Sequence, residues 1–405
     1  MTDVITALSW TRAREAAYAA GSDHRLSAVD LPLADCDGTT LAEPLRTLTD
    51  LPAFPTSSID GWAVRGPAPW RIAGRLLAGS VALPLVEDGT CMEIATGAMV
   101  PDGAEAILRI EDSQVADGLV TGEPRAEPEW RKPGDEAWRG EELLPAGSAV
   151  TPGLIGLAAA SGYDTLSVYP RVSAEMIVFG DELLISGPPG KGRVRDSLGP
   201  QVPSWLRRLG CDVRAVRGPI EDTLAGHVAA VRASLASGVD LIITTGGTMH
   251  GPVDHLHPAL AEVGARYVVN TVEVRPGFPM LLAVLPRDDG RAALLAGLPG
   301  NPQSAVVALS SVVAPALAGL RGRPLPELPT VQLGAAIPGR GDFTHLALVR
   351  RAPDGTAKPV EHVGSAMLRG LAQAIGFALI APGTAATAGD RVPLVPLPIL
   401  TDEAP

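Results

Sequence analysis

The stretch that most constrains this chain is Leu-Pro-Gly-Asn-Pro-Gln-Ser at 298–304, which joins an apolar, strand-like run to a long apolar, helix-like run. Asn301 suits the N-cap of that helix, and Pro302 suits its first position, where a missing N–H group costs nothing. Gly300 lets the backbone approach a ligand closely, and a helix start offers free N–H groups and the positive end of the helix dipole. The turn therefore predicts an anion-binding site, although an ordinary strand-to-helix turn has the same signature.

Two other apolar runs also end in loops that contain glycine. Residues 174–179 lead into Gly-Asp-Glu at 180–182, and residues 240–245 lead into Gly-Gly at 246–247. Strands and helices alternate from 171 to 322, which predicts a doubly wound α/β domain whose ligands bind at the carboxyl ends of the strands. Three such loops predict a ligand that carries phosphate and binds with the help of a metal.

The carboxylates near these loops are the candidate metal ligands. Asp181 and Glu182 directly follow a strand, and paired carboxylates suit a hard cation such as Mg²⁺. Asp240 and Asp254 flank the Gly-Gly loop, and either could share this work. The alternatives remain open at this point. The first pair would then be solvated loop charges, Asp240 a cap at the start of a strand, and Asp254 the N-cap of the next helix.

The rest of the chain predicts three further structural parts, because 405 residues exceed what a single core usually supports. Helical pieces in 1–52 and 132–170 flank a stretch at 53–131 that is rich in short strands, glycine and proline. This pattern predicts a discontinuous helical domain that is interrupted by an inserted β-domain. Short strands in 330–400 predict a small C-terminal β-barrel, which follows the α/β domain at 171–322.

Charge and composition exclude several classes of protein. The net charge of −12 opposes binding to nucleic acid, which is itself negatively charged. The three cysteines have no metal-ligand spacing, so neither a disulfide framework nor a structural zinc is expected. No uninterrupted apolar run reaches 18 residues and the N-terminus shows no secretion signal, so we expect a cytoplasmic protein that does not enter a membrane.

Six motifs, taken in chain order, together resemble those of one known family. They are Phe-Pro-Thr-Ser-Ser-Ile-Asp-Gly-Trp-Ala-Val-Arg at 54–65, Ala-Thr-Gly-Ala-Met-Val-Pro at 95–101, Gly-Asp-Glu-Leu at 180–183, Thr-Gly-Gly at 245–247 with Asp254, Arg-Pro-Gly at 275–277, and Leu-Pro-Gly-Asn-Pro at 298–302. The chain resembles the molybdopterin molybdenumtransferases, the molybdenum-inserting enzymes related to the E domain of gephyrin.

This resemblance implies an activity and a set of site residues. The protein would insert molybdate into adenylylated molybdopterin, with Mg²⁺-dependent cleavage of the AMP moiety, to yield molybdenum cofactor. The implied catalytic residues are Asp60, Thr96, Glu182 and Asp240, and the implied metal ligands are Asp181, Glu182 and Asp254. The implied substrate-binding residues are Gly246, Gly247, Arg275, Pro299, Gly300, Asn301, Pro302 and Ser304.

The resemblance also implies an assembly. Relatives are elongated, multi-domain homodimers whose pocket lies between the α/β molybdopterin-binding domain of one subunit and the N-terminal domains of the other. That arrangement would bring Asp60 and Thr96 near Glu182 of the partner subunit. The partners of such an activity would be a molybdopterin adenylyltransferase and molybdoenzymes that accept the cofactor.

Several positions depart from the family pattern. Phe179 stands where the family has threonine, Leu198 where it has asparagine, and Phe278 where it has lysine. The last change removes a cation from a site meant for phosphate and molybdate. Two alternatives therefore stand beside the main hypothesis. One is a degenerate homologue that binds pterin or acts as a scaffold without turnover. The other is a different pyrophosphate-cleaving enzyme built on the same α/β domain.

Overall fold

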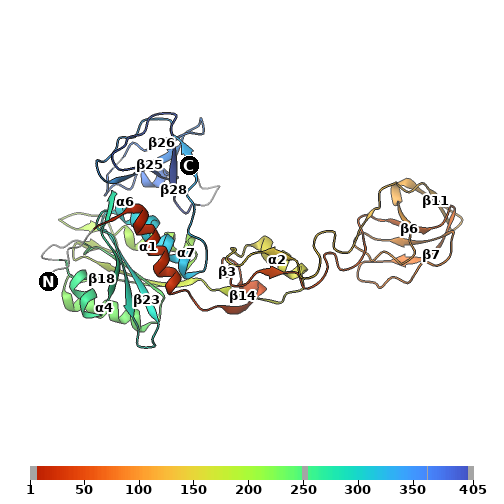
Figure 1. The fold of residues 1–405 in the computed structure, drawn as a ribbon, viewed down its shortest axis with the longest axis horizontal. Coiled ribbons are helices and arrows are strands. Elements are labelled where there is room, and N and C mark those ends of the chain that lie inside the picture. Colours follow the sequence, from red (N-terminus) through yellow and green to blue (C-terminus); the bar gives the residue numbers. More distant parts are fainter. Residues whose placement is uncertain (1–6, 249–253, 363, 400–405) are drawn as a thin grey trace. The chain divides into compact units, whose positions relative to one another are not determined.

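The computed structural model describes residues 7–248, 254–362 and 364–399 (Figure 1). The chain divides into two compact units. The first unit comprises Met1–Val29, Gly38–Ala42 and Val168–Pro405, and the second comprises Asp30–Asp37 and Glu43–Ser167. The first unit therefore holds the predicted α/β domain and the C-terminal domain.

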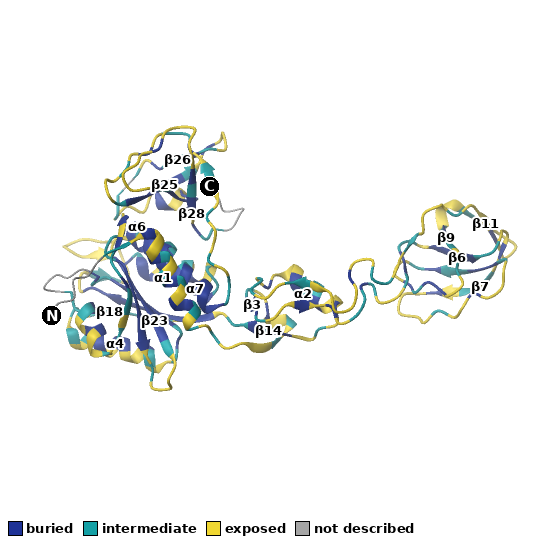
Figure 2. Ribbon diagram, viewed as in Figure 1, coloured by how far each residue is buried: buried dark blue, intermediate teal, exposed yellow. Residues whose placement is uncertain are grey.

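A six-stranded sheet forms the centre of the α/β domain. Its strand order is β18–β15–β19–β23–β22–β20, in which the first four strands are parallel and the last two alternate in direction. The strands are β15 (Val172–Phe179), β18 (Cys211–Ile220), β19 (Leu241–Thr245), β20 (Arg266–Asn270), β22 (Leu281–Pro286) and β23 (Ala292–Leu298). Every residue of β15 and β19 is buried, and the strands of the sheet near β23 are dark blue in Figure 2. Burial on both faces of the sheet explains why the sequences of these two strands are largely apolar.

Helices cover the two faces of this sheet. The helices α3 (Leu198–Arg208) and α1 (Trp10–Asp23) pack in one apolar core with the continuous helical segment α6 (Pro302–Ala308), η3 (Leu309–Val313) and α7 (Ala314–Leu320). On the other face, α4 (Leu224–Ala236) and α5 (Leu256–Glu262) form a second apolar core with the sheet. The predicted doubly wound α/β fold is confirmed.

The helix α1 belongs to the α/β unit (Figure 1), whereas the predicted boundaries grouped residues 1–52 with 132–170. The reason is a close helix crossing. A Cβ atom on Gly21 would lie 2.1 Å from the carbonyl oxygen of Ala316, and one on Gly319 would lie 2.3 Å from that of Tyr18. Glycine on both helices therefore lets α1 and α7 approach to backbone contact.

The segment Pro302–Leu320 is, among the described residues, the one helix long and apolar enough to cross a membrane. However, 89% of its apolar window is buried inside the protein. The indole N–H of Trp10 in α1 also donates a hydrogen bond of 2.8 Å to the hydroxyl of Ser311 within it. The segment is thus the central core helix of the α/β domain, and the cytoplasmic location stays a prediction.

The C-terminal domain is built on a seven-stranded curled sheet, in agreement with the small β-domain predicted there. Its order is β1–β21–β25–β27–β28–β24, with β26 paired to β25. The strands are β1 (Leu8–Ser9), β21 (Val272–Arg275), β24 (Thr330–Gln332), β25 (Thr344–Arg351), β26 (Ala357–Pro359), β27 (Gly376–Ile380) and β28 (Arg391–Pro396), and a short helical turn, η4, spans Leu371–Gln373. The strand β21 comes from the α/β segment, so it joins the two domains of this unit.

The second unit contains the inserted β-domain. Its six-stranded sheet has the order β10–β11–β7–β8–β6–β9, formed by β6 (Gly61–Arg65), β7 (Trp70–Leu76), β8 (Thr90–Ile94), β9 (Ala106–Arg109), β10 (Ser113–Ala116) and β11 (Leu119–Gly122). The helix α2 (Pro152–Ala160) follows, and Thr151 caps it by accepting from the N–H of Leu154. Shorter elements along the chain are β2 (Val29–Pro32), η1 (Leu33–Asp35), β3 (Thr40–Leu41), β4 (Leu45–Arg46), β5 (Thr56–Ser57), η2 (Ile110–Asp112), β12 (Trp130–Arg131), β13 (Glu142–Leu144), β14 (Thr165–Tyr169), β16 (Leu183–Leu184) and β17 (Val194–Arg195).

Candidate active site

The loop after β15 carries the two adjacent carboxylates. Gly180 has a φ of +139°, and a Cβ atom there would lie 2.7 Å from a carboxylate oxygen of Glu182. Glycine is therefore required where the chain folds Glu182 back over the end of the strand. Asp181 accepts a hydrogen bond of 3.3 Å from the N–H of Asp222, which follows β18. Both Asp181 and Glu182 remain exposed, so they are available to a ligand.

Asp222 and His227 complete this group, and neither was predicted. The Nε2 atom of His227 lies 3.9 Å from a carboxylate oxygen of Asp222, and its Nδ1 atom lies 2.9 Å from the carbonyl of Thr223. Burial raises the pKa of Asp222, and the charges of Asp181 and Glu182 raise it further, although His227 opposes them. Burial lowers the pKa of His227. Three carboxylates thus crowd together beside a buried imidazole.

Phe179, which stands where the family has threonine, packs beneath this group of carboxylates and His227. Its ring stacks on the imidazole of His227 with centroids 3.6 Å apart and planes within 10°. A threonine at this position could not make such a contact, because it has no ring. Phe179 at the end of β15 and His227 in α4 thus pack against each other.

The loop after β19 meets the same group. Gly246 and Gly247 have φ values of +85° and +63°, which favour glycine. A Cβ atom on Gly247 would lie 3.8 Å from Nε2 of His227, and one on Gly246 would lie 3.4 Å from the carbonyl oxygen of Phe179. Part of the loop, 249–253, lies outside the described residues. Asp254 precedes α5 and acts electrostatically on His227, and its role as a metal ligand stays a prediction.

The turn from β23 into α6 joins these loops, since the N–H of Gly246 donates to the carbonyl of Leu298 at 3.1 Å. Asn301 occupies the N-cap position and Pro302 the first helical position, as predicted. However, the side chain of Asn301 makes no capping hydrogen bond, and the N–H of Gln303 already donates to the carbonyl of Ser365 at 2.9 Å. The helix start therefore has fewer free N–H groups than the sequence indicates. Pro299, Gly300 and Ser304 lie in this turn and first helical turn, with Ser304 buried.

Arg275 ends β21 and is held by two aromatic rings. Its guanidinium carbon lies 4.4 Å from the ring centroid of Phe343 and 5.2 Å from that of Phe278. A Cβ atom on Gly277 would lie 3.4 Å from the carbonyl oxygen of Ser304, so this loop lies against the first turn of α6. Phe278 lacks the positive charge of the family's lysine, but its ring contacts the neighbouring cation, Arg275.

This aromatic support gives a first prediction. If Arg275 binds molybdate, as the resemblance implies, Phe278→Leu should weaken that binding about two- to fivefold, because a cation–π contact contributes roughly 0.5–1 kcal/mol at an exposed site. Phe278→Tyr keeps the ring and serves as the matched control, with near-normal affinity expected. Calorimetric titration of molybdate checks both variants. Equal affinities for the leucine and tyrosine variants would contradict a supporting role of the ring.

Asp240 lies apart from this group, which contradicts its predicted catalytic role. It precedes β19 at the amino end of the strand, whereas Gly246 follows the carboxyl end. Its carboxylate accepts hydrogen bonds of 2.9 and 2.6 Å from the N–H and hydroxyl of Ser173. Asp240 therefore fixes the start of β19 against β15, which is the structural alternative that the sequence left open.

Leu198 stands where the family has asparagine, and its burial is consistent with an apolar residue at this position. It is buried in the core of the α/β domain at the first position of α3. Asp196 accepts hydrogen bonds of 2.9 Å from the N–H groups of both Leu198 and Gly199, so it caps the helix from two residues upstream. The site loses a side-chain amide at this position, and the helix start is nevertheless satisfied.

In the second unit, Asp60 and Thr96 lie together. A carboxylate oxygen of Asp60 accepts hydrogen bonds of 2.7 Å from the N–H and 2.9 Å from the hydroxyl of Thr96. These bonds lower the pKa of Asp60 and hold its charge at an exposed position. The two motifs predicted to act together are thus joined within this unit, and their catalytic role stays a prediction.

Comparison with known families covers nearly the whole chain. The model described as "MoeA N-terminal region (domain I and II)" matches residues 8–162, that of the "probable molybdopterin binding domain" matches 175–319, and that of the "MoeA C-terminal region (domain IV)" matches 330–397. The three models follow one another in the order of this architecture. The fold and the loops at its sheet edge thus define a protein with a molybdopterin-binding type of α/β domain.

Individual relatives agree. The molybdopterin molybdenumtransferase of Synechococcus elongatus is 28% identical over 93% of this chain and 96% of its own length. That of Haemophilus influenzae is 30% identical over 77% of this chain and 79% of its own length. The crystal structure of the molybdopterin biosynthesis MoeA protein of Pyrococcus horikoshii superposes with a TM-score of 0.76 at 18% identity, over 96% of this chain and all of that one. The chain belongs to the molybdopterin molybdenumtransferases, a family of enzymes that act in molybdenum cofactor biosynthesis.

Proposed function

We propose that this protein inserts molybdate into adenylylated molybdopterin and, with Mg²⁺, promotes cleavage of the AMP moiety, which yields molybdenum cofactor. One observation carries the proposal. The carboxyl ends of four parallel strands meet at a single edge, where glycine-containing loops, the carboxylates of Asp181 and Glu182, and a helix start come together. Such an edge suits a phosphate-bearing ligand and a hard cation.

The cluster of three carboxylates, Asp181, Glu182 and Asp222, suits Mg²⁺ on electrostatic grounds. Asp181 and Glu182 raise the pKa of Asp222, so a cation placed among them would relieve their mutual repulsion. Among the residues that the structure describes, no three acidic, histidine or cysteine side chains have the arrangement of a complete metal site. This suits Mg²⁺, which uses one or two carboxylates and completes its shell with water and substrate phosphates. When bound, the ion would neutralise charge that develops on the phosphoanhydride.

The remaining chemistry would belong to side chains and backbone of this chain. Arg275, which lies against the rings of Phe278 and Phe343, would hold an oxyanion beside the first turn of α6. The loops at Gly246 and Gly300 would hold phosphate through backbone N–H groups without needing a particular side chain. Asp60, kept ionised by Thr96, would contribute from the second unit of a partner subunit. We therefore propose a homodimer.

Release of molybdenum cofactor from adenylylated molybdopterin, molybdate and Mg²⁺ tests this proposal. We expect AMP release that depends on both molybdate and Mg²⁺, and that falls to background when a chelator removes the metal and returns when Mg²⁺ is restored. AMP release without any need for molybdate would instead favour a different pyrophosphate-cleaving enzyme. Binding of adenylylated molybdopterin without AMP release would favour the degenerate homologue.

A further inference from the structure

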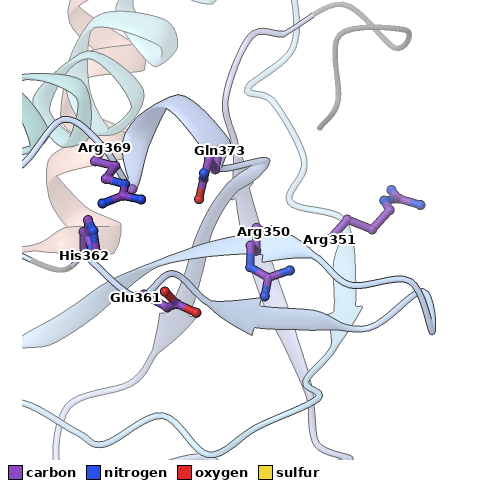
Figure 3. A pocket seen from close by; sticks show the side chains of 7 residues that line it. Arg350, Arg351, Glu361, His362, Arg369 and Gln373 are labelled. Carbon is purple, nitrogen blue, oxygen red and sulfur yellow. The ribbon is translucent and has the colours of Figure 1, made fainter.

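The C-terminal domain has a second polar cavity that the proposed reaction does not use. It has a volume of about 390 Å³ and is lined by the side chains of Arg350, Arg351, Glu361, His362, Arg369 and Gln373 (Figure 3). Three arginines and one acid line this cavity, although the side chain of Arg351 points away from the others (Figure 3), and the chain as a whole has a net charge of −12. We refer to this cavity as the arginine pocket.

The backbone of the arginine pocket is firmly anchored. Gly370 lies at its wall, where a Cβ atom would come within 2.6 Å of the carbonyl oxygen of His362 and 2.7 Å of the side chain of Val360. Val360 and Leu371 on either side are buried in the core, at 3% and 4% exposure. Arg350 lies near the end of β25 and Gln373 ends η4. The groups that line the pocket are thus carried by backbone that packs on the domain core.

The positive charges of the arginine pocket are not neutralised within the described protein. Arg350, Arg351 and Arg369 form no ion pair or side-chain hydrogen bond with any described residue. By contrast, Lys358, which pairs with Arg350 across β25 and β26, has a partner, since its ammonium lies 3.2 Å from Asp354. Arg350 and Arg369 both line this cavity, and their like charges repel each other, so an anion bound between them would stabilise the arrangement.

The lining also selects among anions. Apart from the imidazole of His362, no aromatic ring lines the pocket on which a base or pterin could stack. Guanidinium groups bind phosphate oxygens in pairs, and the amide of Gln373 offers further donors. We propose that the arginine pocket binds a phosphate group, either as the free ion or as a monoester, through Arg350 and Arg369. This site is additional to the proposed reaction and does not depend on it.

The loop that carries Arg369 connects the arginine pocket to the candidate active site through a backbone hydrogen bond. The same loop includes Ser365, whose carbonyl accepts the N–H of Gln303 at the start of α6. A phosphate bound to Arg369 would therefore hold the loop that lies on the first turn of α6. Loop residue 363 itself lies outside the described residues.

Calorimetric titration of the whole protein with inorganic phosphate and, separately, with AMP tests the proposal. The double variant Arg350→Gln, Arg369→Gln should lose at least about tenfold in phosphate affinity, because two charge-assisted contacts disappear. Arg351→Gln is the matched control, since the side chain of Arg351 points away from the others (Figure 3), and it should bind phosphate almost normally. Glu361→Gln should bind about two- to fivefold more tightly, because it removes the one negative charge of the pocket.

These outcomes separate the sources and the rival explanations. Loss of AMP binding alone in the double variant would identify a phosphate monoester, and loss of both would identify a site that accepts the free ion. Affinities that are equal in wild type and double variant, or no binding of either phosphate or AMP to the wild type, would overturn the arginine pocket. Because no turnover is measured, failure of the proposed molybdenum insertion would leave the result unchanged.

Discussion

Glu182→Gln is expected to lower release of molybdenum cofactor by about 100-fold or more, which is the usual cost of losing a group that stabilises charge in the transition state. Glutamine keeps the shape of the side chain and removes its charge. Glu182 is exposed at the end of β15 and is folded back by Gly180, so this substitution does not disturb the core. The variant should therefore melt at the temperature of the wild type.

A second glutamate supplies the control for this experiment. Glu262 is also exposed in the α/β domain, but it ends α5, where no proposed ligand binds. Glu262→Gln should have normal activity, and both variants should be compared at saturating Mg²⁺. A fully active Glu182→Gln protein would show that Asp181 and Asp222 suffice, and it would remove Glu182 from the proposed chemistry.

The sequence was most informative where the backbone itself does the binding. Glycine at 180, 246 and 247 marks strand ends because these φ values and close approaches are difficult for other residues. Proline at the first position of α6 likewise marks a helix start. A single residue type is enough to reveal such a local requirement, so the strand ends and the order of the elements could be predicted without a structure.

Roles that depend on distant contacts could not be predicted in this way. Asp240 is close to the glycine loop in sequence. However, the five residues of β19 separate the two, so Asp240 lies at the opposite end of the strand, where it accepts a hydrogen bond from Ser173. Asp222 was missed because the regular pattern of β18 is interrupted after Val216 by Arg, Gly and Pro, whereas the strand continues to Ile220. A signal did exist, because an acid that follows a parallel strand lies at the same edge as the acids of the neighbouring loop.

The aromatic departures show the same limitation. In the sequence, Phe179 and Phe278 are losses of polar or charged residues from a family motif. In the structure, Phe179 stacks on His227, which lies outside its motif, and Phe278 contacts Arg275, which lies within its own motif. His227 lies 48 residues after its stacking partner, so no local pattern links them.

The location of Asp60 leads to the last prediction, which concerns subunit assembly. Asp60 and Thr96 belong to one compact unit, and Glu182 belongs to the other. If each active site combines the second unit of one subunit with the first unit of its partner, then Asp60→Ala and Glu182→Ala should each be inactive alone but should complement each other. A heterodimer of the two variants would have one site with both substitutions and one site with neither.

Co-expression of the two variants with different affinity tags tests this arrangement. Random pairing makes about half of the dimers heterodimers, so the mixture should recover about a quarter of wild-type activity, and purified heterodimers about half. If instead each site lies within one subunit, every site in the mixture carries one substitution, and no activity returns. The control is a mixture of Glu182→Ala with Glu182→Gln, in which every site is damaged under either arrangement. Light scattering that shows only monomers would exclude a shared site before any activity is measured.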